Sequence, residues 1–204
     1  QLSEMAVKET GFGNIDDKIF KNNYKTKKLI KEIYKIKTNV PILNKKKKIY
    51  EIIKPIGLIS GVTPSTNPIA TALNYIINSI KCRNSIIICP NPRAYNTSFF
   101  LIKKIKEFFL QSKIPQDIVN IVPENIIRDD QLIYFFNNCD KNIVTGNKNF
   151  ILKVRKSIKP FLTFGTGNVP VIVNRDANLS YTTKSIVKSK SFDNSTSCSA
   201  DSVI

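Results

Sequence analysis

The sequence predicts a doubly wound α/β fold built on a parallel sheet, because short β-rich runs alternate with longer helical stretches beyond Tyr50. The run Ser85 to Cys89, SIIIC, is apolar at every position after its first serine, as strands buried on both faces are. The stretch Tyr95 to Ser112 instead repeats its apolar residues at helical spacing. With 204 residues, 42% of them hydrophobic, the chain is long enough to form one large domain with a core.

The first expected element is an amphipathic surface helix from Asp16 to Lys37, lying among lysines. Its apolar residues recur at helical spacing and are Ile19, Phe20, Tyr24, Leu29, Ile30, Ile33 and Tyr34. Such a helix can lie on a membrane surface, but packing of this apolar face on the protein core is the interpretation we favour.

The remaining elements follow one another along the chain. We expect one or two strands at 50–62, a helix at 66–81, a strand at 85–89, a helix at 95–112, a strand at 118–122, a helix at 124–138, a strand at 142–145, a helix at 150–158 and one or two strands at 161–173. Ligands of such sheets bind at the carboxyl ends of the strands. The turns after Val62, Cys89, Val122 and Thr145 are therefore predicted to form the site.

The charge is strongly positive, +17 from 32 Lys plus Arg against 15 Asp plus Glu, a balance that ordinarily suggests nucleic acid or an anionic membrane as partner. Lys, Asn and Ile are abundant together throughout, which is typical of a compositionally biased genome. The lysine run at 45–48 is accordingly interpreted as a solvated loop, with no specific nucleic acid and no membrane as partner. No window reaches about 18 uninterrupted apolar residues and no signal peptide is recognisable, so we expect a cytoplasmic protein.

The cysteines Cys82, Cys89, Cys139 and Cys198 are widely spaced and form no CxxC pair, and the chain has no histidine. A structural metal site is therefore not expected. The lack of histidine also excludes Ser-His-Asp and Cys-His catalysis within this chain. Any nucleophile must then be activated by its environment rather than by an imidazole base.

Several segments resemble one family. They are ETGFGNIDDK at 9–18, the stretch 55–94 with PIGLISGVTPSTNP, RNSIII and PNPRA, FGTGNVPVIV at 164–173, and SKSFDNSTSCSADSVI at 189–204. Together they resemble the CoA-acylating aldehyde dehydrogenases, including the aldehyde half of bifunctional aldehyde-alcohol dehydrogenases. Each motif alone is weakly specific, but their order and spacing cover essentially the whole chain.

The resemblance implies a Rossmann-like NAD-binding domain at 1–175 and the start of a catalytic domain at 176–204. It also implies further residues before Gln1 and after Ile204, so a partial chain is expected, with a homo-oligomer as the form of the whole protein. The implied activity is oxidation of a small aldehyde with NAD as cofactor and coenzyme A as co-substrate, giving acyl-CoA through a cysteine thioester.

The resemblance places the catalytic nucleophile at Cys198 and a donor to the reacting oxygen at Asn67, which acts with the backbone N–H of Cys198. The alternative for Asn67, which precedes a proline, is a turn or helix N-cap residue. Hydrolytic relatives carry a glutamate base in the strand before the nucleophile, where this chain has Phe164, Gly165 and Thr166. Without that base, a thioester is expected to react with the thiol of coenzyme A rather than with water.

The expected cofactor-binding residues follow the ends of the predicted strands. They are Thr63, Pro64, Cys89, Pro92, Arg93, Thr145, Gly146, Gly165 and Gly167. For Arg93, a phosphate contact and simple solvation both remain open. The chain departs from the family at Asn91, where a histidine is usual, and at 147–149, where small residues usually let the backbone approach the dinucleotide.

Two alternatives remain open at the level of sequence. The TSCS surroundings of Cys198 also suit an acylating dehydrogenase for a small polar or sulfonated aldehyde. The second alternative belongs to another functional class, in which the chain is not an enzyme but an inactive truncated remnant or a basic binding module.

Overall fold

A computed structural model describes residues 1–44, 46–128 and 131–201. Its centre is a five-stranded parallel sheet, as predicted, with strand order β5-β4-β3-β6-β7. The strands are β3 (Leu58–Thr63), β4 (Ser85–Pro90), β5 (Val119–Ile121), β6 (Lys141–Thr145) and β7 (Phe161–Phe164). The chain runs outward from β3 to β5 and then returns to the other side of β3. This reversal places a topological switch point between β3 and β6, where such folds bind ligands.

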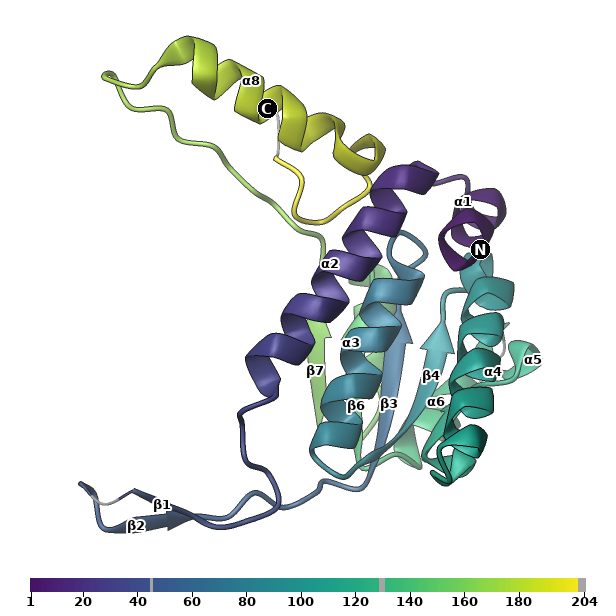
Figure 1. Cartoon of the computed structure of the whole chain (residues 1–204). Coiled ribbons are helices and arrows are strands. Elements are labelled where there is room, and N and C mark those ends of the chain that lie inside the picture. Colours follow the sequence, from purple (N-terminus) through teal and green to yellow (C-terminus); the bar gives the residue numbers. More distant parts are fainter. Residues whose placement is uncertain (45, 129–130, 202–204) are drawn as a thin grey trace.

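Helices cover both faces of the sheet (Figure 1). On one face lie α1 (Leu2–Thr10), α3 (Pro68–Lys81) and α4 (Tyr95–Gln111), with α2 (Ile15–Ile33) packed outside α3. On the other lie α5 (Glu124–Arg128), α6 (Gln131–Asn137) and α7 (Lys148–Val154). Successive side chains of a strand point to opposite faces of the sheet, so each strand contributes to both cores. Ile86 and Ile88 pack under α3 and α4, while Ile87 packs against the core on the other face.

Short elements complete the chain. The 3-10 turns are η1 (Pro92–Ala94), η2 (Gln116–Ile118) and η3 (Phe192–Ser195), and the last long helix is α8 (Leu179–Ser191). Strands β1 (Ile42–Asn44) and β2 (Ile49–Glu51) form an antiparallel hairpin that projects from the body as an arm (Figure 1). The predicted solvated loop is confirmed for 46–48, which are exposed in the hairpin turn, and Lys45 lies outside the described residues.

Several predicted boundaries needed correction. The helix expected at 150–158 is α7, which begins earlier because the side chain of Asn147 accepts a hydrogen bond from the backbone N–H of Phe150. The helix expected at 124–138 is described as α5 and α6, since residues 129 and 130 lie outside the described part. Of 161–173 only β7 pairs with a strand, and Ile172, 93% exposed, lies in the unpaired remainder.

The predicted packing face of the second helix was wrong for most of its residues. Leu29 and Ile33 are half-buried, but the other apolar residues are exposed, namely Ile19, Phe20, Tyr24, Ile30 and Tyr34. The buried residues of α2 are instead Lys18 and Lys21, which face the carboxylate of Asp193. Helical periodicity alone places apolar side chains inside, whereas here an ion pair with a residue about 170 positions later decides which face is buried.

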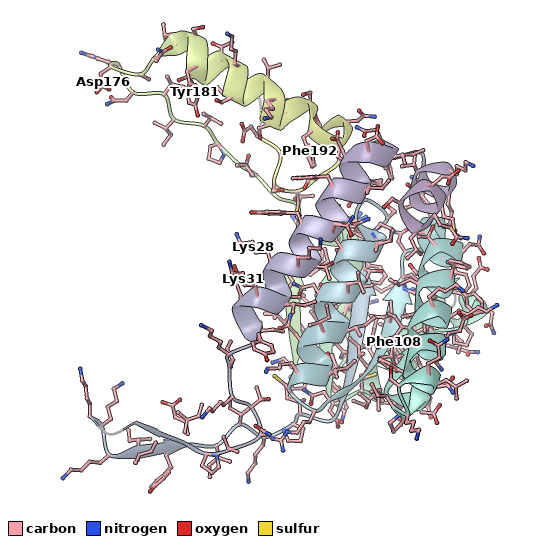
Figure 2. All side chains as sticks on the ribbon, viewed as in Figure 1. Lys28, Lys31, Phe108, Asp176, Tyr181 and Phe192 are labelled. Carbon is pink, nitrogen blue, oxygen red and sulfur yellow. The ribbon has the colours of Figure 1, made fainter. Side chains whose placement is uncertain are left out.

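Helices α1 and α8 were not predicted. Helix α1 is held by Glu9, whose carboxylate accepts hydrogen bonds from the backbone N–H groups of Asn96 and Thr97 at the start of α4. Helix α8 has no buried residue, and Phe192 at its end packs edge-on against Phe20 of α2 (Figure 2). Among the described helices, none combines the length and apolarity needed to cross a membrane.

Candidate active site

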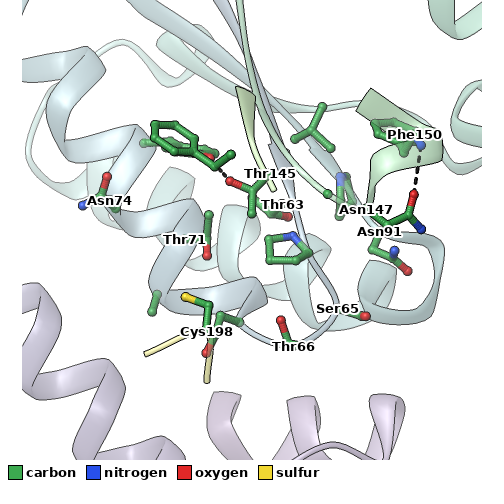
Figure 3. Close-up of a pocket in the computed structure, with 18 of the residues that line it drawn as sticks. Thr63, Ser65, Thr66, Thr71, Asn74, Asn91, Thr145, Asn147, Phe150 and Cys198 are labelled. Carbon is green, nitrogen blue, oxygen red and sulfur yellow. Dashed lines mark hydrogen bonds between the residues drawn. The ribbon is translucent and has the colours of Figure 1, made fainter. Parts of the chain in front are cut away.

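A cavity of about 980 Å³ opens at the carboxyl ends of β3, β4, β6 and β7 (Figure 3). It is bounded by the strand ends, by the start of α3, by one face of α2 and by the segment from Ser195 to Cys198. This is the edge of the sheet where the sequence predicted a site, and the turns after Val62, Cys89 and Thr145 all reach it. The prediction was wrong for the turn after Val122, since the described residues of that turn are not in the lining, and of the helices that follow it Ile127 and Leu132 line the cavity.

Cys198 reaches the cavity on a tightly turned segment. The backbone N–H of Thr196 donates to the carbonyl of Asp193, and that of Ala200 donates to the carbonyl of Ser197. Gly167 lies directly against Cys198, because a Cβ added at this glycine would be 3.0 Å from the Cβ of Cys198 and nearer still to its carbonyl oxygen. Glycine at 167 therefore lets the segment after β7 lie across the thiol, which is itself exposed.

Asn67 lines the same cavity from the start of α3. It occupies the N-cap position, but its side chain makes no capping hydrogen bond. Its Oδ1 is buried and has no partner among the described residues, and neither has Oγ1 of Thr63. Buried polar atoms are normally paired, so these two leave hydrogen-bonding capacity for a ligand.

The expected cofactor residues divide into two groups. Thr63, Pro64, Cys89, Pro92, Thr145, Gly146, Gly165 and Gly167 all line the cavity. Arg93 is exposed and lies outside its lining, with its backbone N–H bonded to the side chain of Asn91.

Some lining residues were not identified from the sequence. Lys25, Thr26 and Leu29 belong to α2, and their spacing gave no signal because only the packing of α2 on α3 brings this face to the cavity. Asn147, which departs from the family pattern, also lines the cavity while it caps α7. The described lining contains lysines at 25 and 153 but neither Asp nor Glu.

The thiols differ in exposure. Cys198 is exposed, whereas Cys89 and Cys139 are buried. Burial raises the pKa of the Cys89 thiol from the ordinary 9.0 to about 12, and burial likewise raises the pKa of Cys139 to about 11. Both buried thiols therefore stay protonated and unreactive near neutral pH.

We expect iodoacetamide at about pH 8 to alkylate Cys198 in the folded chain and to leave Cys89 and Cys139 unmodified until the chain is unfolded. Peptide mass spectrometry of samples taken over time measures this directly. Alkylation of Cys89 as fast as Cys198 in the folded chain would contradict the burial described for it.

Comparisons with known proteins agree with this architecture. The model of the aldehyde dehydrogenase family matches residues 6–204, and the chain belongs to this family. It is 36% identical over 202 residues to a sulfoacetaldehyde dehydrogenase (acylating) of Cupriavidus necator, covering 98% of the chain and 41% of the relative. A crystal structure of an acetylating aldehyde dehydrogenase of Geobacillus thermoglucosidasius matches with a TM-score of 0.88 and 29% identity, covering 98% of the chain and 44% of that protein.

A third match is the propionaldehyde dehydrogenase of Rhodopseudomonas palustris, solved with bound CoA and an acylated cysteine. Its TM-score is 0.80 at 26% identity, with 98% of this chain and 45% of that protein covered. The resemblance to acylating aldehyde dehydrogenases and the predicted fold class are thereby confirmed. The chain spans less than half the length of each of these three proteins.

Proposed function

We propose that this chain supplies the cofactor domain and the nucleophile of a CoA-acylating aldehyde dehydrogenase, with residues 1–175 as the nucleotide-binding domain and 176–204 as the start of the catalytic domain. One observation carries the proposal. Cys198 and Asn67 line one cavity at the switch point of the sheet, and no carboxylate is among its described lining residues.

The first step is attack of the Cys198 thiolate on the aldehyde carbonyl carbon. A C–S bond forms, and the carbonyl electrons move to oxygen to give a thiohemiacetal oxyanion. The side-chain amide of Asn67 and the backbone N–H of Cys198 donate hydrogen bonds to this oxyanion. Asn67 is suited to this role because its side chain is not used as a helix cap.

The cavity fits a dinucleotide in size and in chemistry. It offers the unpaired Oγ1 of Thr63, small residues at 146, 165 and 167, and two lysines that favour a phosphate-bearing ligand. NAD would supply the hydride acceptor that is needed for the oxyanion to collapse to a thioester on Cys198. Thr63, Pro64, Cys89, Pro92, Thr145 and the three glycines would hold it, and Arg93 would contact it only at the periphery.

The fate of the thioester follows from the lining. Hydrolysis requires a base that removes a proton from water, and the described lining has neither carboxylate nor histidine to do so. A thiol is more acidic than water and more nucleophilic, so coenzyme A is the acceptor. Its sulfur displaces Cys198, giving acyl-CoA and the free enzyme thiol.

We expect product formation to depend on CoA. The test protein is a chimera in which this chain replaces the matching segment of the Cupriavidus necator relative. With an aldehyde and NAD, it should release acyl-CoA when CoA is present and only about one equivalent of NADH per enzyme when CoA is absent. Rapid CoA-independent production of carboxylic acid would overturn the acylating assignment.

A polar or sulfonated aldehyde is the second candidate substrate. The Cupriavidus necator relative is named for sulfoacetaldehyde, and the cavity wall near Cys198 carries the hydroxyls of Ser195, Thr196 and Ser197, with Lys25 also in the lining. Comparing kcat/KM of the chimera for acetaldehyde and sulfoacetaldehyde, with NAD and with NADP, decides between the substrates and between the nicotinamide cofactors.

A further inference from the structure

Three buried charged side chains join the two ends of the described chain. The carboxylate of Asp193 is fully buried, and the ammonium groups of Lys18 and Lys21 both bond its Oδ2, Lys18 at 3.3 Å. The two lysine side chains are only 2% and 3% exposed. Burying three charges is costly, so such a cluster persists only where its members are paired and hydrogen-bonded.

The N-terminal segment satisfies Asp193 almost completely. The backbone N–H of Asn14 donates to its Oδ1 at 3.1 Å, and the backbone N–H of Asp193 donates to the carboxylate of Asp17 at 2.8 Å. Gly13, at φ +75°, leaves the space that the carboxylate fills, since a Cβ there would be 2.7 Å from Cγ of Asp193. The loop around Asp193 is therefore fixed from both sides.

The same loop carries unusual backbone geometry. Asp193, Asn194 and Ser195 are consecutive non-glycine residues with φ of 51°, 52° and 59°. Left-handed conformations of this kind are unfavourable for residues other than glycine and persist only where surrounding contacts enforce them. The contacts to α2 and to the segment before it are the ones that hold this loop, and Cys198 lies five residues further on.

Lys18 makes one more contact, which Lys21 does not. Its ammonium group donates to the carbonyl of Thr66 at 3.3 Å, directly before Asn67. One side chain thus bonds both the loop that precedes Cys198 and the turn that carries Asn67. Neither lysine nor Asp193 lines the cavity, so these residues do not touch a substrate there.

We propose that Lys18 is a positioning residue that bridges Asp193 and Thr66 and thereby sets the placement of Cys198 relative to the amide of Asn67. Lys21 acts as the second counter-charge that keeps Asp193 buried. The proposal rests on the proposed function for its catalytic consequence, but the bridge itself is a structural claim. Misplacement of reacting groups by about 1 Å can lower a rate on the order of 100-fold.

The test compares Lys18→Met with Lys21→Met. Each variant leaves one lysine paired with Asp193, so no buried carboxylate is left without a counter-charge and both variants are expected to fold. Only Lys18→Met removes the link to Thr66. Lys28→Met is the matched control, because Lys28 lies on the same helix and points to solvent (Figure 2).

Hydrogen exchange of the chain gives the first measurement. We expect the peptide containing Thr66 and Asn67 to exchange faster in Lys18→Met, and to match wild type in Lys21→Met and Lys28→Met. Unchanged exchange of this peptide in Lys18→Met, or an equal increase in Lys21→Met, would overturn the bridge.

Kinetics of the chimera give the second measurement. We expect Lys18→Met to lower kcat about 10- to 100-fold while KM for NAD changes by less than about threefold, with a smaller loss in Lys21→Met. Equal losses of kcat in the two variants would overturn the positioning role. An inactive wild-type chimera would overturn the proposed function instead. Hydrogen exchange would still show whether Lys18 bridges Asp193 and Thr66.

Discussion

Replacing Cys198 by alanine in the chimera should abolish NADH formation. Without the sulfur no thiohemiacetal forms, and an uncatalysed hydride transfer from a free aldehyde hydrate is far slower. NADH absorbance, followed with saturating aldehyde, NAD and CoA, measures the effect. The thermal unfolding midpoint should change little, because the Cys198 side chain is exposed.

Cys82→Ala is the matched control for this variant. Cys82 is a half-buried cysteine at the end of α3 and does not line the cavity. It should retain nearly all the activity. NADH formation by Cys198→Ala at a rate comparable to wild type would contradict the assignment of Cys198 as the nucleophile.

Replacing Asn67 by alanine should lower kcat roughly 10²- to 10³-fold, the usual loss when one oxyanion donor is removed. Asn67→Asp is the sharper variant, since it keeps the shape of the side chain but replaces the donor with a carboxylate that repels the oxyanion. Its kcat should fall at least as far as that of Asn67→Ala. Initial rates at saturating aldehyde, NAD and CoA measure both.

Asn78→Ala serves as control on the same helix, because the side chain of Asn78 bonds only within the exposed surface of α3. It should leave kcat within about twofold of wild type. If Asn67→Asp were as active as wild type, donation by this side chain would not contribute to the transition state.

Much of the sheet was predictable because its signals are local. The SIIIC run is apolar after its first serine, which is what a strand covered on both faces requires, and it forms most of β4. The helix expected at 66–81 is α3, which begins two residues later at Pro68, whose fixed φ suits the first turn of a helix. The position of the site followed from chain order alone, since parallel strands end at one edge of the sheet.

The features that the sequence did not predict depend on distant partners. Hydrophobic periodicity assigned the wrong buried face to α2, because nothing near Lys18 and Lys21 signals that Asp193 will bury them. The β1–β2 hairpin was missed because each strand has three residues and the turn between them is made of lysines rather than Gly or Asn. Lys25 likewise reaches the cavity only through the packing of one helix on another.

The candidate functional residues also differ in whether a local sequence signal or a distant partner determines their place. Cys198 and Asn67 are proposed as catalytic residues because their motifs resemble those of a family, and both line one cavity in the structure. The sequence has Phe164, Gly165 and Thr166 where the resemblance places the glutamate of hydrolytic relatives, and these three residues line the cavity. The bridge through Lys18 could not be read from sequence, because it joins three segments that meet only in the folded chain.

We propose that the thioester on Cys198 persists until coenzyme A reacts with it. The chimera is incubated with aldehyde and NAD, quenched in acid with and without a brief exposure to CoA, digested and analysed by mass spectrometry. The account predicts an acylated Cys198 peptide that disappears on exposure to CoA, with acyl-CoA formed in equal amount. An unmodified Cys198 peptide, with carboxylic acid accumulating before CoA is added, would contradict it.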